Sequence, residues 1–222
     1  MGKKFSVLGD SISTLEGYNP PGYSLFFQGE KCKKAKVFTR EDTWWGQVID
    51  FFGGELLVNN SWSGSRVTRL PNSFELFPSG CSDERTNGLH IGNVTPDIII
   101  VYMGTNDWGF GVKPEPDFSQ AYDNMLNKLR NNYPEAEIWC CTLSATYVSA
   151  IPKFVFPYSC GGFHMDLYNN IIRDLVSRHN CRLIDLAGHN EPYDSIDGSH
   201  PNARGMKTLA SVMIKEMLWE YL

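Results

Sequence analysis

The stretch "VLGDSIS", Val7 to Ser13, joins two apolar residues to a glycine, an aspartate and a serine. Two interpretations compete at this junction. A strand-to-helix turn with a polar cap needs only a Ser or Asp side chain that accepts hydrogen bonds from free helix amides. A nucleophile held at the carboxyl end of a buried strand needs partners elsewhere in the chain. The rest of the sequence therefore decides what Ser11 does.

Five apolar runs in the chain are continuous rather than alternating, which is typical of strands in a parallel sheet covered on both faces. They are "FSVLG" (5–9), "ELLVNN" (55–60), "DIIIVYMG" (97–104), "EIWCCTL" (137–143) and "CRLIDL" (181–186). Between them, apolar residues recur at helical spacing over 118–129, 167–176 and 206–218. This order predicts an α/β protein with a doubly wound, three-layer α/β/α fold of about five parallel strands.

One further helix is expected to begin near Asp42 or Thr43 and to end before Gly53 and Gly54. Three segments, 12–41, 65–95 and 144–162, are predicted to be irregular because they are rich in Gly, Pro, Asn and aromatic residues. Ligands of such sheets bind outside the carboxyl ends of the strands. We therefore expect these loops to gather around the functional site.

The length and charge of the chain set limits on its organisation and partners. A chain of 222 residues suits a single domain, residues 1–222, with a sizeable core. The net charge of −5 and the lack of a long basic run give little support to nucleic-acid binding. No apolar run approaches the roughly 18 residues that cross a bilayer, so no stable membrane insertion is expected. Since the amino terminus lacks the apolar core of a secretory signal, a cytoplasmic location is expected unless a leader has been removed.

The six cysteines show no Cys-x-x-Cys spacing, and Cys140 and Cys141 are adjacent within an apolar run. Free, mostly buried thiols are therefore expected rather than disulfides. The histidines likewise show no metal-ligand spacing. We predict no metal and no cofactor.

Residues with catalytic chemistry follow the predicted strands. Ser11 follows the first strand, Gly64 follows the second in "SWSGS", and Asn106 follows the third in "GTNDW". The segment "DGSHPNARG" after the last strand contains Asp197 and His200. Because the carboxyl ends of parallel strands share one edge of the sheet, these residues are expected to meet.

These residue types are the parts that acyl transfer needs. A serine hydroxyl requires a base, and a histidine oriented by a carboxylate three residues earlier in a turn can serve as that base. The amides of Ser11 and Gly64 and the side chain of Asn106 would supply three donors to an oxyanion. The chain therefore contains the partners that a nucleophilic Ser11 would need.

The blocks "GDSIS", "SGS", "GTND" and "DGSHP" resemble, in order and approximate position, the four signature blocks of the SGNH hydrolases, also called GDSL-type esterases and lipases. The resemblance spans nearly the whole chain and implies a flavodoxin-like three-layer fold. It also implies that Ser11 is the nucleophile, His200 the base and Asp197 its orienting acid, with Ser11, Gly64 and Asn106 forming the oxyanion hole. Ile12 stands where the family's name has leucine, an aliphatic exchange that does not touch the chemistry.

The predicted function is hydrolysis of carboxylic esters through an acyl-enzyme, with a small-molecule ester as partner. We expect a short acyl group, such as acetyl on a carbohydrate-like alcohol, because no long apolar lid helix is evident and Trp62, Trp108 and Tyr147 are expected to rim the site. Core packing explains each of these aromatic residues about as well. The alternatives are a lysophospholipase or thioesterase of the same family and, from another class, a non-catalytic ligand-binding module. The sequence does not predict the oligomeric state.

Four charged residues near these blocks have structural explanations. Asp10 and Asp107 are expected to fix the turns that carry Ser11 and Asn106. Arg66 and Arg85 could hold an anionic substrate group, but arginines in loops more often brace backbone or carboxylate groups.

Overall fold

The computed structural model of the protein describes residues 2–69 and 78–219. Its centre is a five-stranded parallel sheet in the order β2-β1-β3-β4-β8. The strands are β1 (Lys4–Gly9), β2 (Glu55–Ser61), β3 (Ile98–Tyr102), β4 (Glu137–Cys141) and β8 (Arg182–Ile184). The predicted three-layer α/β fold with about five parallel strands is confirmed.

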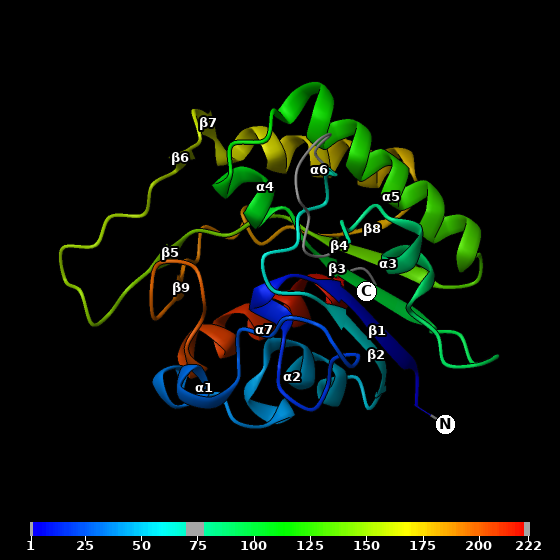
Figure 1. The fold of residues 1–222 in the computed structure, drawn as a ribbon, viewed down its shortest axis with the longest axis horizontal. Helices are drawn as coiled ribbons and strands as arrows, with labels where there is room; N and C mark the ends of the chain where they lie inside the picture. The colour runs from blue at the N-terminus through cyan, green and yellow to red at the C-terminus, as the bar shows by residue number, and fades with distance from the viewer. Residues whose placement is uncertain (1, 70–77, 220–222) are drawn as a thin grey trace.

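Helices cover both faces of the sheet, as Figure 1 shows. One layer contains α1 (Gly29–Ala35), α2 (Trp44–Phe51) and α7 (Ala203–Trp219), and the other contains α3 (Asp83–Asn87), α5 (Ser119–Asn132) and α6 (Met165–Arg178). Successive β3 residues alternate between the two layers, since Ile98 and Ile100 pack in one core and Ile99 and Val101 in the other. Continuous apolar strands are therefore required on both sides.

Shorter elements decorate the edges of this frame. They are the 3₁₀ turns η1 (Ser11–Ser13) and η2 (Arg40–Asp42), the one-turn helix α4 (Thr105–Gly109) and the π-helical turn η3 (Pro114–Phe118). Two small sheets pair β5 (Thr146–Tyr147) with β9 (Tyr193–Asp194), and β6 (Ser159–Cys160) with β7 (Phe163–His164).

The segments expected to be irregular contain short helices. α1 lies within 12–41 and α3 within 65–95. Each buries only two of its residues, so neither shows the apolar periodicity by which the longer helices were predicted. The helix expected near Asp42 or Thr43 is α2, and Thr43 caps it by accepting a hydrogen bond from the Gly46 amide.

The topology creates a switch point between β1 and β3. From β1 the chain passes first to β2 on one side, and the next strand of the sheet, β3, pairs with the other side of β1. The loops after β1 and β3 therefore lead away in opposite directions from the carboxyl edge of the sheet, and α/β proteins bind ligands at such a switch point. Ser11 and Asn106 follow these two strands.

The six cysteines are free thiols, but only half of them are buried, fewer than the expectation of mostly buried thiols. Cys32, Cys140 and Cys141 are buried, whereas Cys81, Cys160 and Cys181 are partly exposed. Among the described residues, no helix has both the length and the apolar character needed to cross a membrane.

Candidate active site

Ser11, His200 and Asp197 form a continuous hydrogen-bonded series. The Ser11 Oγ lies 2.9 Å from Nε2 of His200, and Nδ1 of the same ring lies 2.9 Å from Oδ2 of Asp197. With its Nδ1 proton donated to Asp197, the ring presents Nε2 as the acceptor for the Ser11 hydroxyl. The predicted residues therefore meet, although 189 positions separate Ser11 from His200.

The turn from Asp197 to His200 is closed by the aspartate itself. Its Oδ1 accepts hydrogen bonds from the amides of Ser199, at 3.1 Å, and His200, at 2.9 Å. Gly198 within the turn has a φ of +91°, a conformation that L-residues with a side chain rarely adopt. The turn thus presents the carboxylate and the imidazole on one side.

Asp197 stays ionised in this arrangement. Burial by itself would raise the pKa of its carboxyl, but hydrogen bonds from the ring and the backbone amide of His200 outweigh that effect and lower the pKa to about 2. A carboxylate that is charged at neutral pH can orient the imidazole and stabilise an imidazolium.

The predicted oxyanion donors come from three neighbouring elements. Ser11 begins η1, Gly64 lies in the turn after β2 with a φ of +81°, and Asn106 lies on α4. The Asn106 Nδ2 donates to the carbonyl of Ser65 at 3.0 Å and approaches Oδ2 of Asp10 at 3.4 Å. The carboxamide is therefore fixed against the loop that carries Gly64.

Asp10 and Asp107 shape the turns, as expected. Asp10 caps η1 by accepting from the Ile12 amide at 3.0 Å. Asp107 accepts hydrogen bonds from the amides of Val67 and Thr68 and from the Thr68 hydroxyl. Burial raises the pKa of Asp10 to about 7 and that of Asp107 to about 6.

Arg85 is a buried brace of backbone and polar groups, in agreement with the structural explanation of its role. Its side chain is fully buried and donates to Gly9, Asn60, Ser65 and Pro78. Arg66 lies elsewhere, with its guanidinium 5.7 Å from the ring centroid of Phe110.

An aromatic ring that was not singled out in the sequence covers the candidate base. The Phe26 ring stacks on the His200 imidazole, with centroids 3.3 Å apart and an interplanar angle of 5°. Its backbone amide donates to Oγ1 of Thr14, which itself donates to the Ser11 carbonyl at 3.0 Å. The only sequence signal for Phe26 was its place in the 12–41 segment that was expected to gather at the site.

The three aromatic residues expected at the rim have different environments. Trp108 is buried in the core beside α5 and stacks on Phe156, so the core-packing alternative applies to it. Trp62 is partly buried, its ring centroid lying 4.1 Å from that of Tyr23. Tyr147 on β5 is 37% exposed. Trp62 and Tyr147 thus retain surface that a ligand could contact.

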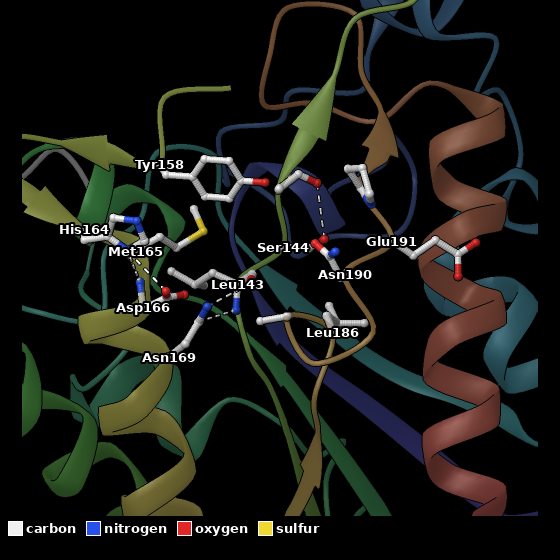
Figure 2. Close-up of a pocket in the computed structure, with 13 residues that line it drawn as sticks. Leu143, Ser144, Tyr158, His164, Met165, Asp166, Asn169, Leu186, Asn190 and Glu191 are labelled. Atoms are coloured by element: carbon white, nitrogen blue, oxygen red, sulfur yellow. Dashed lines mark hydrogen bonds and ion pairs between the residues drawn. The ribbon is translucent and has the colours of Figure 1, made fainter. Parts of the chain in front are cut away.

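A cavity of about 450 Å³ lies farther along the same edge of the sheet, beyond the ends of β4 and β8 (Figure 2). Leu143 and Leu186 line it from the loops after these two strands. Met165 lines it from the start of α6, and Tyr158 lines it from the segment before that helix. None of the Ser11, Asp197 and His200 side chains lines this cavity. It is therefore a separate hollow.

Within residues 2–69 and 78–219, no group of three His, Cys, Asp or Glu side chains is placed so that it could hold a metal ion. Three of the histidines instead lie within ion-pair distance of single carboxylates: His164 with Asp166, His179 with Asp123 and His189 with Glu216.

The protein is thus an α/β protein with a doubly wound parallel sheet and a hydrogen-bonded Ser–His–Asp series near the switch point of that sheet. The family model described as GDSL-like Lipase/Acylhydrolase matches residues 3–151, and the chain belongs to this family. Its fold and its sequence blocks agree with that membership.

Two curated proteins are similar to parts of the chain. The Multidomain esterase of Ruminococcus flavefaciens is 24% identical over 162 residues, which cover 70% of this chain and 20% of that protein. The Cellulase/esterase CelE of Acetivibrio thermocellus is 37% identical over 46 residues, 21% of this chain and 6% of that protein. The matches thus span only a small part of these longer relatives.

Solved structures share the fold over nearly the whole chain. A protein from Bacteroides uniformis described as a GDSL-like lipase has a TM-score of 0.69 at 26% identity, covering 100% of this chain and 95% of that one. A family two carbohydrate esterase from Clostridium thermocellum, in complex with cellohexaose, has a TM-score of 0.66 at 17% identity, covering 99% of this chain and 64% of that one. The second likeness concerns the fold alone.

Proposed function

We propose that the protein is a serine esterase that cleaves carboxylic esters through an acyl-enzyme on Ser11. The observation that carries this proposal is the series of two 2.9 Å contacts from Ser11 Oγ through the His200 ring to Asp197. Nucleophile, base and orienting acid are thus within hydrogen-bond reach of one another, as this chemistry needs.

The steps follow from the geometry. Ser11 Oγ attacks the ester carbonyl carbon while its proton passes to Nε2 of His200, and Asp197 stabilises the imidazolium. The carbonyl oxygen becomes an oxyanion, which can accept hydrogen bonds from the backbone amides of Ser11 and Gly64 and from the carboxamide of Asn106. Collapse of this intermediate breaks the bond between the carbonyl carbon and the leaving oxygen, which takes the proton from His200 and departs as the alcohol. Water then attacks the acyl-enzyme by the same route, releasing the acid and restoring Ser11.

For the substrate we propose a short acyl group, acetyl above all, on a carbohydrate-like alcohol. The curated relatives are called esterases, one of them a cellulase/esterase, and the cellohexaose complex belongs to a structural neighbour described as a carbohydrate esterase. In this chain, the partly exposed rings of Trp62 and Tyr147 support the proposal, since aromatic rings stack on sugar faces.

The acyl preference is tested with p-nitrophenyl esters from acetate to dodecanoate, with acetylated xylo-oligosaccharides, and with a lysophospholipid and an acyl thioester as competing substrates. The expected result is a kcat/KM that peaks at acetate, with release of acetate from the sugars. A peak at eight or more carbons, or faster turnover of the lysophospholipid or the thioester, would replace this substrate with one of the family alternatives.

A further inference from the structure

Arg85 is a buried cation, and within residues 2–69 and 78–219 its side chain donates five hydrogen bonds, each to an uncharged acceptor. Its Nε donates to Oδ1 of Asn60 at 2.7 Å, Nη1 donates to Oγ of Ser65 at 2.7 Å and to the Pro78 carbonyl at 3.3 Å, and Nη2 donates to the carbonyls of Gly9 at 2.8 Å and Asn60 at 2.9 Å. Burial lowers the pKa of the guanidinium to about 10, which leaves it charged at neutral pH. Burying a charge is costly, so its position calls for an explanation.

Two of these acceptors belong to the segments that carry the oxyanion donors. Gly9 is the last residue of β1 and stands two positions before Ser11, and Ser65 directly follows Gly64. One planar guanidinium therefore joins the end of the nucleophile's strand to the loop that carries the second donor. Arginine suits this task because its donors keep a fixed fork geometry.

Ser65 also links Arg85 to the third oxyanion donor, Asn106. While the Ser65 hydroxyl accepts from Arg85, the Ser65 carbonyl accepts the 3.0 Å hydrogen bond from the Asn106 carboxamide. A shift of Ser65 would therefore displace Gly64, its neighbour in the chain, and would reorient the Asn106 carboxamide, which is hydrogen-bonded to it.

We propose that Arg85 is a positioning residue for ester hydrolysis, which aligns the three oxyanion donors through its hydrogen bonds to Gly9 and Ser65. The inference rests on the proposed function. Oxyanion donors must be placed within about 0.5 Å to be effective, and the loss of one typically lowers the rate by about 10² to 10³.

The test is a double-mutant cycle between Ser65 and Asn106. Ser65→Ala removes the hydroxyl that Arg85 holds and keeps the carbonyl that orients Asn106. We expect it to lower kcat by about tenfold with KM unchanged, and Asn106→Ala to lower kcat by about 10² to 10³. In the Asn106→Ala background, Ser65→Ala should cost less activity than in wild type, because one of the two donors through which Ser65 acts is already lost. Affinity for a trifluoromethyl ketone, which forms an oxyanion on Ser11, should fall in parallel with kcat/KM.

Ser79→Ala is the matched control, since Ser79 is another buried serine near this loop and its hydroxyl contacts Cys81. It should leave kcat and KM unchanged. If Ser65→Ala does not fold, Arg85→Lys enters the same cycle, because lysine keeps the charge and loses the fork. Equal fold-losses in the wild-type and Asn106→Ala backgrounds, or no effect of Ser65→Ala, would overturn the positioning role. A wild-type protein without esterase activity would instead overturn the proposed function.

Discussion

Asp10 lies beside the nucleophile as a fully buried carboxyl group. Burial raises its pKa to about 7, although the hydrogen bond from the Ile12 amide and the nearby Arg85 cation oppose the rise. The negative charge of Asp107 adds to the rise, and the phenols of Tyr102 and Tyr193 also lie within electrostatic reach. The carboxyl group of Asp10, which fixes the turn at Ser11, is thus harder to ionise in the folded protein than in the unfolded chain.

A dependence of stability on pH follows. Between about pH 4 and pH 7 the folded carboxyl holds a proton that the unfolded one has released, so stability falls as pH rises through this window. The rise from 3.8 to about 7 corresponds to roughly 4 kcal/mol of stability lost above pH 7. Asp10→Asn removes the ionisable group and therefore this loss. The unfolding free energy of the variant minus that of wild type should increase by up to roughly 4 kcal/mol from pH 4 to pH 8.

Urea unfolding at several pH values measures this difference. Asp117→Asn serves as the control, because Asp117 is exposed and should show a difference near zero throughout. A difference for Asp10→Asn that is the same at pH 4 and pH 8 would contradict the account.

At the level of elements, the sequence predicted those whose apolar pattern is strong. The five continuous runs became the five strands, and residues 118–129, 167–176 and 206–218 lie largely within α5, α6 and α7. α1 and α3 were not predicted, because a short helix that buries two residues leaves no periodic signal. Trp108 was expected at the rim, yet its place on α4 turns it into the core.

The start of α2 depends on one hydroxyl. Thr43 is fully buried, and its Oγ1 accepts from the Gly46 amide at 3.0 Å and donates to the Arg40 carbonyl at 2.6 Å. Thr43→Val keeps the volume and loses both hydrogen bonds, so we expect a loss of about 1–2 kcal/mol in unfolding free energy. Thr43→Ser keeps both and should lose less than about 1 kcal/mol, the worth of one buried methyl group. Denaturant unfolding compares the two variants, and equal losses would refute the capping role.

On the scale of the whole molecule, the site exists only in the folded chain. Ser11 follows the first strand, and His200 precedes the last helix. The sequence blocks identified the residue types of the site, since acyl transfer limits which side chains can serve. They could not identify the stacking of Phe26 on His200 or the bonds from Arg85 to Gly9 and Ser65, because these contacts join segments that only tertiary packing brings together.

Ser11 is the proposed nucleophile of the esterase, and covalent labelling identifies such a serine. The most direct measurement treats wild type, Ser11→Ala and the control Ser63→Ala with diethyl p-nitrophenyl phosphate and identifies the modified peptide by mass spectrometry, alongside p-nitrophenyl acetate turnover. We predict one diethylphosphoryl group on Ser11 in wild type and Ser63→Ala, with loss of acetate turnover on labelling. Ser11→Ala should take up no label and should lose at least about 10³-fold in kcat. Equal turnover by wild type and Ser11→Ala, or a label on another residue, would contradict the account.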